Sequence, residues 1–146
     1  MRSSRISSPR YVQSTLRRRI YPLLQDVTGL LDDDGWGPLH YVAMKGHLSL
    51  AKIMIDWGWN PDALDKWNNT PLYRATGFGH ENMVYYLVER GANVHHQNDY
   101  KNNMIHNSAW AGHANITKFF IEKGLSPLDR DYVHHIALWD MVHSFF

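Results

Sequence analysis

The sequence predicts an all-α solenoid of stacked helix-turn-helix units joined by hairpin loops. A repeat of 33 residues runs through the chain, because Gly46-His47 recurs as Gly79-His80 and again as Gly112-His113. Apolar residues and a Pro-Leu pair keep the same step. Such a period is typical of repeat proteins, in which one helix pair cannot bury its own apolar face and must stack on its neighbours.

Length and composition agree with one folded domain. The 146 residues are 44% apolar and 20% charged, which is enough apolar surface for a core. No apolar run approaches the roughly 20 residues that span a bilayer. The chain has no cysteine, which excludes disulfides, thiolate metal sites and thiol nucleophiles.

Residues 1–19 are predicted to form a disordered, basic tail rich in serine and arginine. The first twenty residues hold six arginines and no acid, and the rest of the chain is mildly acidic. This composition is also typical of an organelle transit peptide, so a solvated tail and an organelle address both stay open. The tail lacks the apolar core of a secretory signal, so we do not expect secretion. An acidic body argues against nucleic acid as its main partner.

Residues 20–31 are predicted to cap the N-terminal end of the stack. Pro22 interrupts the helical pattern, so we expect a break or a second helix there, and Gly29 is a stop signal. The pattern of apolar residues at helical spacing begins before this range, within residues 11–31, and consists of Leu16, Ile20, Leu23, Leu24 and Val27.

Three repeats follow, over residues 32–64, 65–97 and 98–130. In the second repeat Thr70 can cap the first helix, and Pro71 suits its first position because the missing N–H costs nothing there. Gly79 ends that helix as a residue that tolerates positive φ. A second helix is predicted from about Glu81 to Arg90.

The other two repeats depart from this pattern at their caps. Asn103 can cap the first helix of the third repeat, whereas Gly37 is a weaker cap in the first. Residues 131–146 are predicted to be a truncated fourth repeat that closes the stack. Phe145 and Phe146 at its end would fold back or mark an interface. Whether the chain is complete or part of a longer protein stays open.

Residues 70–75 read Thr-Pro-Leu-Tyr-Arg-Ala and are followed by Gly79-His80 and by Leu87 to Val94. With these residues the sequence resembles the ankyrin-repeat family, whose 33-residue unit carries a Thr-Pro-Leu-His-x-Ala signature. The resemblance covers roughly residues 32–131. It implies a non-catalytic module that binds another protein as an adaptor, scaffold or inhibitor, without a cofactor. It does not identify the partner.

The ten histidines invite a metal-site hypothesis, which the repeat weakens. Adjacent histidines, as in His95-His96 and His134-His135, point in different directions and chelate poorly. We therefore expect no metal site, and no nucleophile elbow, P-loop or dinucleotide fingerprint predicts an enzyme. The resemblance implies structural hydrogen bonds for the histidines in signature columns: His40, His47, His80, His106 and His113.

The run Asp32-Asp33-Asp34 could suggest a Ca²⁺ or Mg²⁺ site. Consecutive aspartates diverge, however, and Asp32 falls in the same column as Asp65, Asn98 and Asp131. We therefore interpret the aspartate column as a structural part of the hairpins.

In ankyrin proteins the partner-facing surface is usually the hairpin tips and the exposed ends of the first helices. The resemblance places several aromatic residues there on one concave surface, and exposed aromatics are typical binding hot spots. Alternatively, some of them pack between neighbouring hairpins, as we expect of Trp57 and Trp59 at the second helix. The candidate partner-binding residues are Asp33, Asp34, Trp36, Met44, Lys45, Lys66, Trp67, Phe78, Asp99, Tyr100, Trp110 and Tyr132.

The sequence thus predicts a cytoplasmic protein-binding module with no small-molecule substrate. The acidic tip residues Asp33, Asp34 and Asp99 favour a partner with a basic face. The alternative is a targeting or regulatory piece, whose basic tail directs it to an organelle, an anionic membrane or nucleic acid.

Overall fold

The computed structural model describes residues 31–130, which hold three pairs of helices. The predicted tail, the N-terminal cap, the truncated fourth repeat and Tyr132 lie outside the described residues. Each repeat delimited from the sequence contributes two helices. Their bounds are Pro38–Lys45 (α2), Leu48–Asp56 (α3), Pro71–Gly77 (α4), Glu81–Glu89 (α5), Met104–Trp110 (α6) and Ala114–Glu122 (α7).

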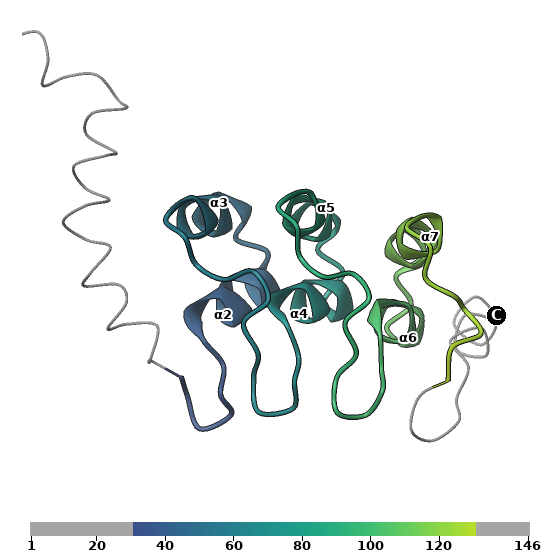
Figure 1. Cartoon of the computed structure of the whole chain (residues 1–146). Coiled ribbons are helices and arrows are strands. Elements are labelled where there is room, and N and C mark those ends of the chain that lie inside the picture. The colour runs from purple at the N-terminus through teal and green to yellow at the C-terminus, as the bar shows by residue number, and fades with distance from the viewer. Residues whose placement is uncertain (1–30, 131–146) are drawn as a thin grey trace, which may run out of the picture.

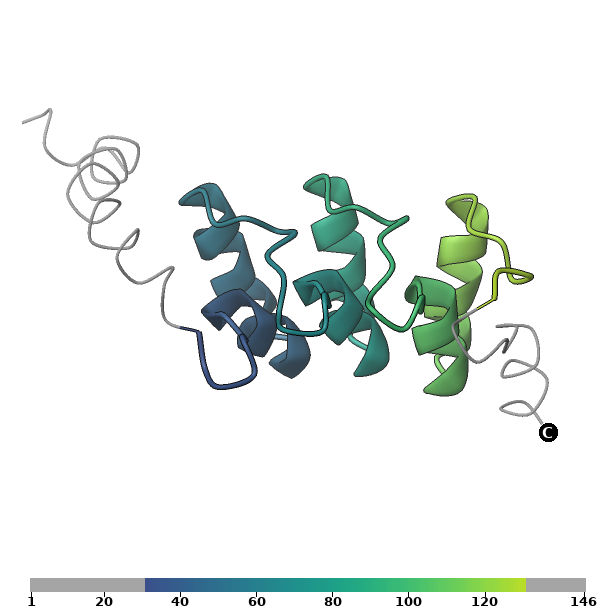
Figure 2. The ribbon, with the colours of Figure 1, turned by 60° about the horizontal axis from the view of Figure 1, so that its bottom comes forward.

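The helices form two rows (Figure 1). The first helices of the repeats, α2, α4 and α6, make one row, and α3, α5 and α7 make the other. The hairpins that precede α2, α4 and α6 extend on the side of the first row that faces away from the second. Figure 2 shows the same succession of helix pairs along the stack from another direction. The fold is therefore the all-α solenoid that the sequence predicts.

The helix starts follow from the capping residues. The Thr70 hydroxyl accepts the backbone N–H of Tyr73 at 3.1 Å. The side-chain oxygen of Asn103 accepts the N–H groups of Ile105 and His106 at 3.0 and 3.2 Å. Both predicted caps are confirmed. Gly37 has no side chain to cap α2, and its own N–H donates to Nδ1 of His40 at 3.1 Å.

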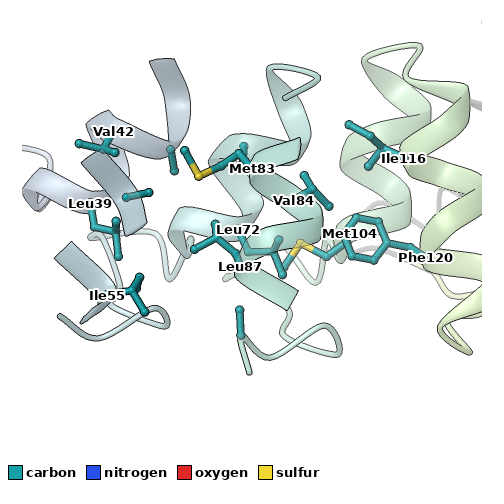
Figure 3. Close-up of a cluster of buried hydrophobic side chains, with 14 of the residues drawn as sticks. Leu39, Val42, Ile55, Leu72, Met83, Val84, Leu87, Met104, Ile116 and Phe120 are labelled. Atoms are coloured by element: carbon teal, nitrogen blue, oxygen red, sulfur yellow. The ribbon is translucent and has the colours of Figure 1, made fainter. Parts of the chain in front are cut away.

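The core lies between the two rows and runs without interruption through the three repeats. Each fully buried Leu, Ile, Met or Phe stabilises the fold by about 1.5–3 kcal/mol relative to an exposed side chain. Figure 3 shows side chains from successive repeats meeting in this core. Among the core residues are Leu39, Leu72, Met83, Val84, Leu87, Met104, Ile105, Ile116 and Phe120.

The third repeat places a polar pair in this core. Ser108 and Thr117 are almost fully buried, and their equivalents in the other repeats are Val or Ala. The two hydroxyl oxygens lie 2.8 Å apart, and Ser108 donates to the carbonyl of Ile105 at 3.2 Å. The pair therefore satisfies its own hydrogen bonds, as buried polar groups must.

The hairpins are organised by the aspartate column. A side-chain oxygen of Asp65 accepts the N–H groups two and four residues further on, at 2.9 and 2.8 Å. Asp32 and Asn98 bond their own hairpins in the same way. The turn places one residue of each hairpin at positive φ, and at Gly35 (φ 75°) a Cβ would lie 2.8 Å from the backbone nitrogen of Lys66. The structural interpretation of Asp32 and Asp65 is therefore confirmed.

Histidine side chains tie each repeat to the next. Nε2 of His80 donates to the carbonyl of Met44 at 2.6 Å, and Nε2 of His113 donates to that of Gly77 at 3.1 Å. Gly79, with φ at 75°, leaves room for this contact, because a Cβ there would lie 2.5 Å from the His113 ring.

The other histidines divide into bonded and unbonded rings. His40 and His106 donate to the carbonyls of Asn69 and Asp129, at 3.1 and 2.9 Å. The ring of His47 is exposed and makes no hydrogen bond within residues 31–130. The sequence did not predict the bond from His96 to the carbonyl of Asn68, at 2.7 Å, because its column holds no other histidine.

Candidate partner-binding face

We call the surface formed by residues 31–37, 64–70 and 97–103 and by the exposed ends of α2, α4 and α6 the inner face. Each described candidate residue from the sequence lies on one of these elements. Asp33, Asp34, Trp36, Lys66, Trp67, Asp99 and Tyr100 lie on the hairpins, and Met44, Lys45, Phe78 and Trp110 lie at the helix ends.

An alternation of aromatic rings and cations occupies the first two repeats of the inner face. The guanidinium of Arg74 lies 3.9 Å from the ring centre of Trp36 and 6.0 Å from that of Trp67. The rings of Trp36 and Tyr41 are 5.1 Å apart, and the ammonium of Lys66 lies 4.4 Å from the Trp67 ring. Trp36 and Trp67 are therefore half-buried against other side chains of the chain itself. We call these five residues the ladder.

Arg74 is anchored by a buried carboxylate. It forms an ion pair with Asp65, whose side chain is 0% exposed, while Arg74 is 17% exposed. Burial alone would raise the pKa of Asp65. The carboxylate accepts hydrogen bonds from Asn69, Arg74 and the backbone N–H of Trp67. These hydrogen bonds outweigh burial and hold the pKa of Asp65 below its usual value.

Sequence reasoning missed Arg74. Its equivalents in the other repeats are Tyr41 and Asn107, so no column marks the position. Its partners Trp36 and Asp65 lie far apart along the sequence, and only the folded hairpins bring both of them to α4.

The second and third repeats carry aromatic residues that stand free of this ladder. Phe78, Tyr100 and Trp110 are 56%, 54% and 80% exposed. Trp110 is the last residue of α6, and its equivalents are Met44 and Gly77. Gly77 therefore leaves this row of helix ends without a side chain between Met44 and Trp110.

Asn107 holds the backbone beside this gap. Its amide nitrogen donates to the carbonyl of Tyr73 at 2.6 Å, and a Cβ on Gly77 would lie 3.0 Å from the Asn107 side chain. A glycine at position 77 thus allows the two first helices to approach.

The charges of the hairpin tips are partly used within the fold. Asp34 forms an ion pair with Lys66, and Asp99 accepts the side-chain amide of Asn68 at 2.6 Å. Backbone bonds join the same tips, from the N–H of Lys66 to the carbonyl of Asp34 and from that of Asp99 to the carbonyl of Trp67. Two of the three aspartates expected to steer a partner are therefore engaged in joining hairpins, and the third, Asp33, is exposed.

Tyr41 extends the network at the first hairpin. Its hydroxyl donates to the carboxylate of Asp32. This bond is the main cause that lowers the pKa of Asp32 and raises that of Tyr41. The hydroxyl thereby joins α2 to the turn that carries the exposed Asp33.

Metal-ligating clusters and membrane-spanning helices are both absent from the described part of the chain. Across residues 31–130, no group of three or more His, Cys, Asp or Glu side chains is placed to hold a metal ion. None of the helices of that segment is long and apolar enough to cross a membrane.

The sequence matches known families of repeats. A family model described as ankyrin repeats in three copies matches residues 12–98, and one described as ankyrin repeats in many copies matches residues 87–131. The first match alone covers more than half of the 146 residues. No curated protein matches the chain.

Proposed function

The chain belongs to the ankyrin-repeat family, and from this premise we propose that it binds another protein through its inner face. Ankyrin repeats are generally protein–protein interaction modules, and the family is typically non-catalytic. Stacked repeats create an extended surface to which each unit contributes a hairpin and a helix end. The proposal assigns binding to that surface in this chain.

The observation that carries the proposal is the exposure of three large aromatic residues on one face. Trp110 is 80% exposed, and Phe78 and Tyr100 are more than half exposed. Aromatic side chains bury about 150–250 Å² each and dominate interface energetics. A folded chain gains nothing from holding them in water, whereas an interface that buries them gains affinity at a small cost in rotamer entropy.

The ladder has a supporting role in this proposal. Trp36 and Trp67 are held by Arg74 and Lys66, which fixes the hairpins of the first two repeats. A rigid surface loses less entropy on binding than a mobile one. The contact would therefore centre on the aromatic residues of the second and third repeats, with Asp33 steering a basic partner. Adaptor, scaffold and inhibitor would all use this same contact.

Affinity capture from the lysate of the source cell tests the proposal. The bait is the whole chain, compared with Tyr100→Ala/Trp110→Ala. The matched control is Leu50→Ala/Ile53→Ala, which removes two apolar side chains of 45% and 47% exposure from α3 in the second row. We expect one partner to be retained by the wild type and by the control. The inner-face variant should lose it by about tenfold or more, as hot-spot residues do.

Circular dichroism of all three proteins is the folding control. A partner retained equally by both double variants would place the interface elsewhere. A folded inner-face variant that has lost its partner would support the inner face and also supply the partner's identity.

The charge of the N-terminal segment favours a second candidate function. Six arginines without an acid in the first twenty residues suit an organelle address or binding to an anionic membrane or nucleic acid. The family match begins at residue 12, so the test deletes residues 1–10 and replaces Arg17, Arg18 and Arg19 with glutamine, which together removes all six arginines. If partner capture survives this deletion while location in the cell changes, the segment is an address. An unchanged location would contradict it.

A further inference from the structure

The second row of helices has two helix junctions at equivalent positions of the repeat, which we call the first and the second groove, and among the described residues an ion pair crosses only the first. Between α3 and α5, Asp56 and Arg90 pair at 2.8 Å, and Arg90 lies 6.0 Å from the ring centre of Tyr86. Lys52 lies 5.7 Å from the same ring. Two cations of the chain itself therefore lie over the aromatic ring of this first groove.

In the next groove, between α5 and α7, a different residue stands at each of the equivalent positions. The residues 33 positions further on are the equivalents: Glu89 for Asp56, Lys123 for Arg90 and Phe119 for Tyr86. In the same way, Tyr85 is the equivalent of Lys52, and Val88 is the equivalent of Ile55. The aromatic ring and the carboxylate are kept, while one cation is lost and the guanidinium becomes an ammonium.

The substitution leaves the second groove open. Tyr85, Val88, Glu89, Phe119 and Lys123 line a groove of about 380 Å³. The Tyr85 and Phe119 rings lie 4.7 Å apart. Lys123 lies 5.3 Å from the Phe119 ring, and among the described residues neither Lys123 nor Glu89 has an ion-pair partner.

The charge around this groove favours a cation as its occupant. Glu89, the last residue of α5, has no ion-pair partner among residues 31–130. Burial first, and then the negative charges of Glu81 and Glu122, raise the pKa of Tyr85. The charge of Lys118 is already paired with that of Glu122, at 4.0 Å. Lys123 lies over the ring of Phe119 on α7.

We propose that the α5–α7 groove binds an arginine side chain of a partner protein, which supplies the guanidinium that Arg90 supplies in the neighbouring groove. The guanidinium would pair with Glu89 and stack on Tyr85, away from the Lys123 ammonium over Phe119. Arginine fits better than lysine, because its planar fork pairs with a carboxylate and stacks on an aromatic ring at once. This site lies in the second row of helices, so it does not depend on the function proposed for the inner face.

The test is a titration of the whole chain followed by NMR. The probes are N-acetyl methylamides of arginine, lysine, glutamate and leucine. We expect the arginine probe to shift the Val88 methyl signals and the Tyr85 and Phe119 ring signals saturably. The methyl signals of Ile55, the equivalent of Val88 in the closed groove, should not move.

Two variants locate the site. Glu89→Gln should weaken the binding of the arginine probe by about twofold to fivefold, as expected for an exposed charged pair. Lys123→Arg should abolish the binding, because the chain's own guanidinium can then pair with Glu89, as Arg90 does with Asp56. Asp56→Asn, in the closed groove, is the matched control and should leave the titration of Val88 unchanged.

Other outcomes would overturn the inference. Stronger binding of the glutamate probe would assign the groove to an anion held by Lys123. Equal binding of the leucine probe would make it an apolar contact only, and equal shifts at Ile55 and Val88 would show that the probe is unselective. Absence of any shift at Val88 would show that an arginine side chain does not bind there.

Discussion

Replacing Arg74 with alanine tests whether the ladder of the inner face is structural. Arg74 joins a buried carboxylate to a tryptophan, because it pairs with Asp65 and stacks on Trp36 at 3.9 Å. Loss of a hydrogen bond to a charged group costs about 1.5–3 kcal/mol, and loss of a cation–π contact costs about 0.5–2 kcal/mol.

Two features make the total cost of removing Arg74 smaller than the sum of these two losses. Asp65 keeps the N–H groups of Trp67 and Asn69, so its carboxylate is not left without partners. The Nε–H of Arg74 is itself buried without an acceptor among the described residues, which reduces the net value of the side chain. We therefore expect Arg74→Ala to lower the free energy of unfolding by about 2–3 kcal/mol, which is less than the cost of isolating a buried charge completely.

Urea unfolding measures this change. With a slope of about 1–3 kcal/mol per M, the midpoint should fall by roughly 0.7–3 M, or by about 1–1.5 M at a slope of about 2 kcal/mol per M. Arg90→Ala is the matched control, because its pair with Asp56 is exposed, at 44% and 62%, and such pairs contribute at most about 1 kcal/mol.

The comparison of the two arginines decides the outcome. If Arg74→Ala costs no more than Arg90→Ala, the ladder does not hold the hairpins. Trp36 and Trp67 would then belong with the residues free to bind a partner.

Two further predictions concern buried polar groups. Burial lowers the pKa of His40 from its ordinary 6.5, so its neutral ring stabilises the fold fully above about pH 6.5 and less as the pH falls through the folded-state pKa. The urea midpoint should therefore drop more steeply between roughly pH 7.5 and 5 in the wild type than in His40→Gln, and equal slopes would contradict this. In the third repeat, Ser108→Ala and Thr117→Val should each lower the free energy of unfolding by about 1–3 kcal/mol. The double variant should cost less than the sum of the two, since it leaves no hydroxyl unpaired, and strict additivity in calorimetry would show that the pair is not coupled.

Most of the fold could be predicted from the sequence, because the residues that begin and end each helix recur at a fixed step. The prediction of a second helix from about Glu81 to Arg90 agrees with α5 at Glu81–Glu89. Thr70 and Asn103 cap the helices at which they were expected. Capping is a local effect, so a short stretch of sequence contains all the residues that it needs.

The site was harder to predict because exposure depends on neighbours in other repeats. Trp67 and Tyr100 are equivalent residues of successive hairpins, yet Trp67 is half-buried and Tyr100 is 54% exposed. Trp67 has cations at two neighbouring positions, Lys66 and Arg74. Equivalent positions in the repeat therefore predict which backbone positions carry aromatic side chains, but they do not predict which of these side chains remain exposed.

The difference between these equivalent positions is itself informative about function. At Tyr100 the equivalents of Lys66 and Arg74 are Asp99 and Asn107, neither of which carries a cation to cover the ring. The α5–α7 groove differs from its neighbour in the same way, since it keeps an aromatic ring and a carboxylate but lacks the guanidinium. In both places the repeat that lacks the guanidinium leaves an aromatic ring that we propose a partner covers. In a stack of near-identical units, a contact present in one repeat and missing in the next therefore indicates both where a ligand can bind and which chemical group it must bring.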